Sequence, residues 1–241
     1  MRRVKMGQLP ELPYSVEEAV NRLRVNVSFA GNDVRRIMVI STVPDEGKSF
    51  VTMHLWRQMA GAGSPSLLLD ADMRKSVLLS DYGIEAEDKQ PLKGTTHYLA
   101  SDALELEDVI YHTEIEGGDI LPNADNVINP SLLIEGERFE QLLKSASEKY
   151  RYVFIDAPPL DLVSDGELIG SHCDGAILVI HAGSTPKRLI RNSVRQLERA
   201  NCPLLGVVLN RVEASKGGYY GKRYGGKYYG KYYVTEEADK N

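Results

Sequence analysis

A phosphate-binding loop is the clearest chemical pattern in the chain. The segment 42–49 reads TVPDEGKS, and it lies between a short apolar run and an apolar pattern with helical spacing. It matches the P-loop pattern G-x-x-x-x-G-K-[ST] at Gly47, Lys48 and Ser49, whereas Thr42 stands at the first glycine position. In such a loop, backbone amides and a helix N-terminus hold phosphate oxygens, a lysine reaches the β and γ phosphates, and a serine hydroxyl binds magnesium. The sequence therefore predicts a nucleoside triphosphate site with Lys48 and Ser49 in these two roles.

Acidic side chains follow two other apolar runs of the chain. Asp70 and Asp72 come after one run, and Asp156 ends another. Because open α/β sheets bind ligands at the carboxyl ends of their parallel strands, we expect the three carboxylates to gather near the P-loop. Carboxylates in a poorly solvated site repel one another unless a cation joins them. Magnesium takes carboxylate and phosphate oxygens, so we expect Ser49, Asp72 and Asp156 to organise Mg²⁺ directly or through water.

The elements that must position these residues follow an α/β pattern. Short aliphatic runs alternate with longer amphipathic stretches, which is typical of a mostly parallel sheet covered by helices. Strands are predicted at 37–42, 66–72, 152–158, 175–181 and 204–210, with a weaker one at 117–122. Helices are predicted near 16–30, 130–149 and 186–200. We expect an N-terminal helical segment at 1–32, a P-loop domain at 33–214 and a flexible tail at 215–241.

Composition and charge indicate a folded, water-soluble body with a tail of different character. The 241 residues are 42% hydrophobic and 26% charged, and no apolar run is long enough for a membrane span or a signal peptide, so a cytoplasmic protein is expected. Residues 216–233 consist of seven tyrosines, six glycines and five basic residues. The chain carries a net −5, so without the +5 of this segment the body carries −10. An acidic body argues against a general nucleic-acid surface, although interleaved Tyr, Lys and Arg can stack on bases.

The motifs together resemble those of the bacterial tyrosine kinases, which are cytoplasmic P-loop enzymes of polysaccharide assembly systems. Residues 44–49 resemble the Walker A loop of that family, 67–74 its Walker A′ motif and 153–159 its Walker B motif. The tyrosine-rich segment resembles its C-terminal autophosphorylation cluster. The resemblance covers nearly the whole chain, and the combination of Walker A′ with a tyrosine cluster is its most specific part.

The resemblance implies an ATP- and magnesium-dependent protein tyrosine kinase of a deviant, MinD-like P-loop fold. Its implied catalytic residues are Lys48, Asp70, Asp72 and Asp156. Its implied nucleotide-binding residues are Pro44, Asp45, Glu46, Gly47, Lys48, Ser49, Phe50, Arg74 and Asn210. Its implied phosphate acceptors are Tyr219, Tyr220, Tyr224, Tyr228, Tyr229, Tyr232 and Tyr233.

Several roles stay open at this point. Asp70 is expected to receive the tyrosine proton, but Asp70 and Asp72 could exchange roles. Arg74 either steadies a phosphate or forms a surface salt bridge, and Asn210 either reads the adenine edge or ends a strand. Asp45 stands where the family loop has glycine, and Phe50 where it commonly has threonine.

The family resemblance also implies partners. Glu18, Arg22 and Arg24 lie in a segment similar to the E-x-x-R-x-x-R oligomerisation motif, in which Asn21 replaces the first arginine. The expected partners are further copies of the chain in a ring, a separate transmembrane adaptor or co-polymerase that recruits it to the inner face of the membrane, and a cognate tyrosine phosphatase. The expected role is control of capsule or exopolysaccharide synthesis and export. The main alternative is a ParA- or MinD-like ATPase switch without a protein acceptor.

Overall fold

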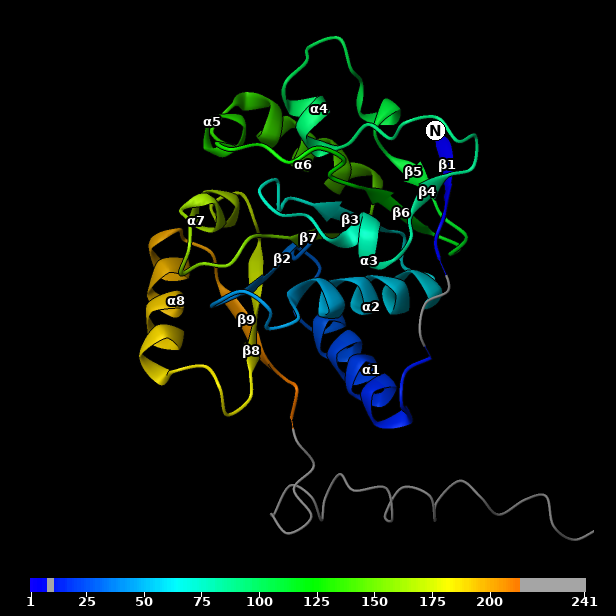
Figure 1. The fold of residues 1–241 in the computed structure, drawn as a ribbon. Helices are drawn as coiled ribbons and strands as arrows, with labels where there is room; N and C mark the ends of the chain where they lie inside the picture. Colours follow the sequence, from blue (N-terminus) through cyan, green and yellow to red (C-terminus); the bar gives the residue numbers. More distant parts are fainter. Residues whose placement is uncertain (8–10, 213–241) are drawn as a thin grey trace, which may run out of the picture.

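The computed structural model describes residues 1–7 and 11–212, and their fold is a sheet covered by helices on both faces (Figure 1). Within these residues the strands are β1 Arg2–Lys5, β2 Arg36–Ser41, β3 Ser66–Asp70, β4 Glu85–Ala86, β5 Tyr111–His112, β6 Gly118–Leu121, β7 Tyr152–Asp156, β8 Gly175–His181 and β9 Leu204–Asn210. The helices are α1 Tyr14–Ser28, α2 Lys48–Gly61, α3 Leu78–Asp81, α4 Thr95–Leu99, α5 Ser131–Ile134, α6 Glu137–Lys149, α7 Asp165–Gly170 and α8 Lys187–Arg199, with a 3₁₀ turn at Leu106–Asp108.

The described strands form one mostly parallel sheet in the order β4-β1-β5-β6-β3-β7-β2-β8-β9. The pairs β1 with β4 and β5 with β6 are antiparallel, and the other pairs are parallel. β7 lies between β3 and β2, so the carboxyl ends of these three strands are neighbours. This register places Asp70 directly beside Asp156.

The central strands are apolar on both sides because helices cover both faces of the sheet. Along β2, Ile37 and Val39 belong to the core beneath α2, whereas Met38 and Ile40 belong to the core beneath α6, α7 and α8. Trp56 of α2 is fully buried in the first core. Figure 1 shows α1 lying against α2 on the first side. Because side chains alternate along a strand, β2, which leads into the P-loop, packs into the cores on both faces of the sheet.

The predicted strands are all present, with ends that differ by two residues or fewer. The single predicted helix at 130–149 is instead two helices, α5 and α6, which Gly136 separates in an extended conformation. β1, β4 and β5 were not predicted, and β1 adds a strand to the segment 1–32 that was expected to be helical. The tail predicted at 215–241 lies outside the described residues.

Candidate active site

The P-loop connects β2 to α2 through two residues in left-handed backbone conformations. Asp45 has φ 62° and Gly47 has φ 90°. The left-handed conformation favours glycine at position 47, and a side chain there would displace the Asn210 side-chain nitrogen. Asp45 is exposed, and its carboxylate is therefore open to solvent. A left-handed residue at position 45 explains why the family loop has glycine there.

Glu46 faces the interior of the protein, and its side chain does not face the phosphate side of the loop. It is only 1% exposed, and its Oε2 accepts hydrogen bonds from the backbone N–H groups of Thr42 and Val43 at 2.7 and 2.9 Å. Its Oε1 accepts hydrogen bonds from the His181 backbone N–H at 3.0 Å and from the Thr185 hydroxyl. The predicted nucleotide contact of Glu46 could therefore come only from its backbone.

Thr42, at the first glycine position of the general P-loop pattern, also has a structural role. Its hydroxyl is within hydrogen-bond distance of Ser193 of α8 at 3.2 Å, and both residues are buried. The Thr42 hydroxyl, which a glycine would lack, therefore joins the start of the loop to α8.

The acids predicted to meet near the P-loop do so, around one ammonium group. Lys48 Nζ lies 3.0 Å from Asp72 Oδ2 and 3.5 Å from Asp156 Oδ2. The Ser49 hydroxyl donates to Asp156 Oδ2 at 2.6 Å. Thr52, one turn further along α2, donates to Asp156 Oδ1 at 3.2 Å. Thr52 was not among the predicted site residues, although its position four residues after Lys48 places it on the same side of the helix.

Burial controls the protonation of this cluster. Burial lowers the pKa of Lys48, but the charges of Asp156 and Asp72 outweigh that effect and raise this pKa to about 12. Burial, then the charge of Asp156, raises the pKa of Asp70 to about 7. Burial also raises the pKa of Asp156. At neutral pH the cluster thus holds one ammonium against a set of carboxylates that a second cation would stabilise.

Asp70 is the most enclosed of the three acids, with no exposed surface. Its Oδ2 accepts from the Ser76 hydroxyl at 2.5 Å, and its Oδ1 accepts from the Asp72 N–H at 3.2 Å. Ser76 lies in the loop after β3, and the sequence analysis did not identify it. These bonds fix the Asp70 side chain at the edge where β3 and β7 end.

The predicted magnesium ligands fit that ion, although they do not form a closed cage. Among the residues that the structure describes, no three His, Cys, Asp or Glu side chains are arranged to hold a metal ion by themselves. Magnesium in nucleotide sites commonly uses one or two carboxylates and completes its coordination with phosphates and water. The buried hydroxyl of Ser49 and the carboxylates of Asp72 and Asp156 provide that partial set.

Arg74 is held by an ion pair, but its partner is a buried carboxylate and the pair is not the surface salt bridge that the alternative predicted. Its Nε lies 2.5 Å from Asp165 Oδ2, and its Nη1 donates to the Ile128 carbonyl at 2.7 Å. Asp165 is fully buried and also accepts from the Ser131 hydroxyl at 2.8 Å. Arg74 therefore joins the loop after β3 to α7 and to the segment before α5.

Asn210 and Phe50 border the loop from two other directions. The Asn210 side-chain nitrogen donates to the Glu46 carbonyl at 2.8 Å, so the end of β9 is attached to the P-loop. Phe50 packs on the His54 ring with ring centroids 4.3 Å apart. A role of Asn210 at the adenine remains a prediction.

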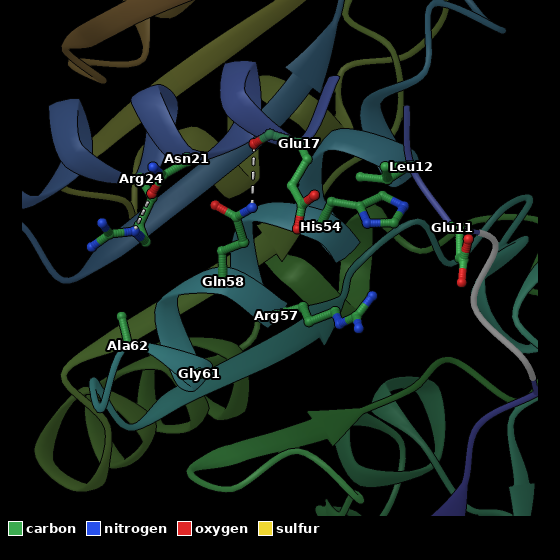
Figure 2. Close-up of a pocket in the computed structure, with 10 residues that line it drawn as sticks. All are labelled: Glu11, Leu12, Glu17, Asn21, Arg24, His54, Arg57, Gln58, Gly61 and Ala62. Atoms are coloured by element: carbon green, nitrogen blue, oxygen red, sulfur yellow. Dashed lines mark hydrogen bonds between the residues drawn. The ribbon is translucent and has the colours of Figure 1, made fainter. Parts of the chain in front are cut away.

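The predicted oligomerisation residues Glu18, Arg22 and Arg24 all lie on α1, on the far side of α2 from the sheet. Arg24 lines a cavity of about 600 Å³ together with residues of α2. Figure 2 shows the side chains that surround it. His54 reaches this cavity and is 2% exposed, and among residues 1–7 and 11–212 its Nε2 has no hydrogen-bond partner. Burial, then the charge of Arg57, lowers the pKa of His54 to about 4. This cavity is separate from the Lys48 cluster, and the sequence analysis assigned His54 no role.

Comparison with known proteins agrees with the nucleotide site that the geometry indicates. Residues 37–222 match the CobQ/CobB/MinD/ParA nucleotide binding domain model. The tyrosine-protein kinase CpsD of Streptococcus agalactiae is 32% identical over 212 residues, which is 86% of this chain and 90% of that protein. The chain belongs to the bacterial tyrosine-protein kinase family.

Solved structures agree with this family assignment. The VpsO kinase domain is 30% identical, covers 83% of this chain with 95% of its own, and superposes with a TM-score of 0.75. MinD of Pyrococcus horikoshii, solved with Mg-ADP, is 25% identical with a TM-score of 0.61 and covers 76% of this chain with 72% of its own. The P-loop fold predicted from sequence is thereby confirmed. Within the described residues, no helix has the length and apolar character needed to span a membrane.

Proposed function

We propose that the chain transfers the γ-phosphoryl group of ATP to tyrosines of its own C-terminal segment. The observation that carries the proposal is the Lys48 ammonium, which sits between Asp72 and Asp156 at the start of α2. A P-loop lysine and carboxylates at the adjacent strand end are the groups that phosphoryl transfer needs, because that reaction depends on positioning and charge neutralisation. The tyrosine cluster at 219–233 provides the acceptors.

In the proposed reaction Lys48 turns from the carboxylates to the β and γ phosphates, and the loop amides bind the phosphate oxygens. Ser49, Asp72 and Asp156 would hold magnesium, which when bound would neutralise the developing charge on the phosphates. The phenol oxygen bonds to the γ phosphorus as the bond from phosphorus to the β–γ bridging oxygen breaks, which leaves ADP. The phenol proton passes to a carboxylate, and Asp70 suits that step because its pKa is raised to about 7.

The decisive experiment is incubation of the purified chain with magnesium and ATP, followed by mass spectrometry of the tail. We expect phosphate on tyrosines within 219–233, no phosphate in Lys48→Met, and a strong loss in Asp70→Asn. Lys144→Met is a matched control, because Lys144 is an exposed residue of α6 away from the loop. An unmodified tail in the wild-type chain, with ATP still hydrolysed, would contradict the proposal.

An unmodified tail with continued ATP hydrolysis would favour the ATPase switch. The similarity to MinD makes this switch the second candidate function. A switch hydrolyses ATP without a protein acceptor. Replacing all seven cluster tyrosines with phenylalanine separates the two candidates, since a switch would keep its full phosphate release. A kinase would lose its incorporated phosphate.

The proposed biological setting follows from the relatives. The similarity to the tyrosine-protein kinase CpsD and to the VpsO kinase domain supports the role that the family resemblance implies, which is control of capsule or exopolysaccharide synthesis and export. We propose a homo-oligomeric ring formed through Glu18, Arg22 and Arg24 of α1, a separate transmembrane adaptor that recruits the chain to the inner face of the membrane, and a cognate tyrosine phosphatase.

Charge reversal at Arg22 and Arg24 would convert the ring to monomers, which light scattering would detect as a lower mass. An unchanged mass would exclude this surface.

A further inference from the structure

We infer that Glu46 is a positioning residue for nucleotide binding, which sets the shape of the P-loop from its buried side without touching a phosphate. The inference rests on the proposed use of this loop for ATP. The carboxylate joins two parts of the chain that are distant in sequence. One oxygen holds the start of the loop, and the other holds the connection from β8 to α8.

All acceptor positions of this buried carboxylate are used. It receives hydrogen bonds from three backbone N–H groups and one hydroxyl, and a carboxylate offers about four acceptor sites. None of these four partners is a cation. The carboxylate is therefore kept in place by oriented donors, and its loss would leave buried N–H groups without an acceptor.

These bonds determine which amides of the loop face the phosphates. The N–H groups of Thr42 and Val43 are directed at Glu46, and Pro44 has no N–H. The amides that remain for phosphate oxygens begin at Asp45 and continue into the first turn of α2, where helix N–H groups have no partner within the helix.

The residues on each side of Glu46 show why the loop needs such an anchor. Asp45 and Gly47 both have left-handed backbone conformations, and these persist where the surrounding structure holds them. The Glu46 carbonyl is held as well, by the Asn210 side chain at 2.8 Å. Position 46 thus ties the loop to the ends of β8 and β9, and the side chain is the part that a substitution can test.

The first test compares magnesium-ATP affinity in the wild type and in Glu46→Gln by titration calorimetry. An amide keeps the size of the side chain but has a single acceptor oxygen, so about half of the donors lose their partner. We expect affinity to fall by about tenfold or more. Glu140→Gln, on an exposed position of α6, is the matched control and should bind like the wild type.

A second pair of variants keeps the inference testable if Glu46→Gln does not fold. Thr185→Val removes one donor to Glu46 and should weaken ATP binding by about threefold, while Thr185→Ser restores the hydroxyl and the affinity. Rescue by serine is not expected if residue 185 only fills space. If Thr185→Val and any folded Glu46→Gln protein bind magnesium-ATP as tightly as the wild type, the inference is overturned and the proposed function is not affected. A wild-type chain that binds no magnesium-ATP would overturn the proposed function as well.

Discussion

Asp70 gives the site a pH dependence that can be measured without any substrate. Burial is the main cause that raises the pKa of Asp70 to about 7, above the usual value of an aspartate near 4, so the folded protein holds the neutral acid below about pH 7. The unfolded chain loses this proton near pH 4, whereas the folded protein keeps it until about pH 7. The stability that the neutral form provides is therefore complete at low pH and is lost as the pH rises through this window.

We predict that the free energy of unfolding of the wild type, relative to Asp70→Asn, falls by a few kcal/mol between about pH 4 and about pH 7. Asparagine does not titrate, so the difference between the two proteins isolates this residue. Urea denaturation at intervals across the window measures it. A difference that stays level, or that grows with pH, would show that Asp70 is ionised in the folded protein.

Asp45 combines a left-handed backbone with a negative charge beside the expected phosphates. We predict that Asp45→Gly strengthens magnesium-ATP binding by about twofold to fivefold, because it removes the charge and suits the conformation. Asp45→Asn separates the two causes, since asparagine tolerates the same backbone but is neutral. The charge contribution should shrink in high salt. If calorimetry finds unchanged binding in both variants, Asp45 has no effect on the nucleotide.

Motifs predicted the central part of the site because its residues are close in sequence or end neighbouring strands. Lys48, Ser49 and the three acids could be identified in this way, and the structure brings them together. Their supporting partners could not be identified. Ser76, Ser193 and Thr185 are common residue types in ordinary positions, and only the folded chain brings their hydroxyls to the site.

At the scale of elements, sequence predicted the long strands and the four-residue β6, and it missed β1, β4 and β5. β2, β7 and β8 have continuous apolar runs because both of their faces are covered. β4 and β5 have two residues each, which is too short for any periodic pattern. β1 reads RRVK, and only its Val4 is buried, so its role depends on pairing with β4 and β5 far along the chain.

The contribution of β1 to stability can therefore be tested at Val4. Val4 is fully buried in the core that also contains Trp56 and Leu68. Replacing Val4 with alanine should lower the free energy of unfolding by about 2 kcal/mol, from lost burial and the cavity left behind. Lys5→Ala, at the exposed neighbouring position, is the control and should change it by less than about 0.5 kcal/mol. Equal midpoints in urea for Val4→Ala and the wild type would mean that β1 adds nothing to the core.

The whole molecule is divided by charge, with a basic tyrosine-rich segment on an acidic body. Each phosphate adds about −1.5 to −2, so three of them would cancel the +5 of residues 216–233. We predict that phosphorylation weakens the attraction between tail and body and reduces the size of the assembly. Gel filtration in ATP, before and after phosphatase treatment, measures this change. Identical elution of the two forms would contradict the prediction, and a chain with the seven tyrosines changed to phenylalanine is the control.

The attachment of β9 to the P-loop has a consequence for the proposed phosphorylation of the tail. Asn210 contacts the loop directly, and Tyr219 follows it nine residues later, so a tether of at most about 30 Å separates this tyrosine from the phosphate site. Every later tyrosine has a longer tether from the same fixed point. A linked acceptor has an effective concentration that depends on this length. The order in which the tyrosines are used should therefore follow chain geometry more than their local sequence.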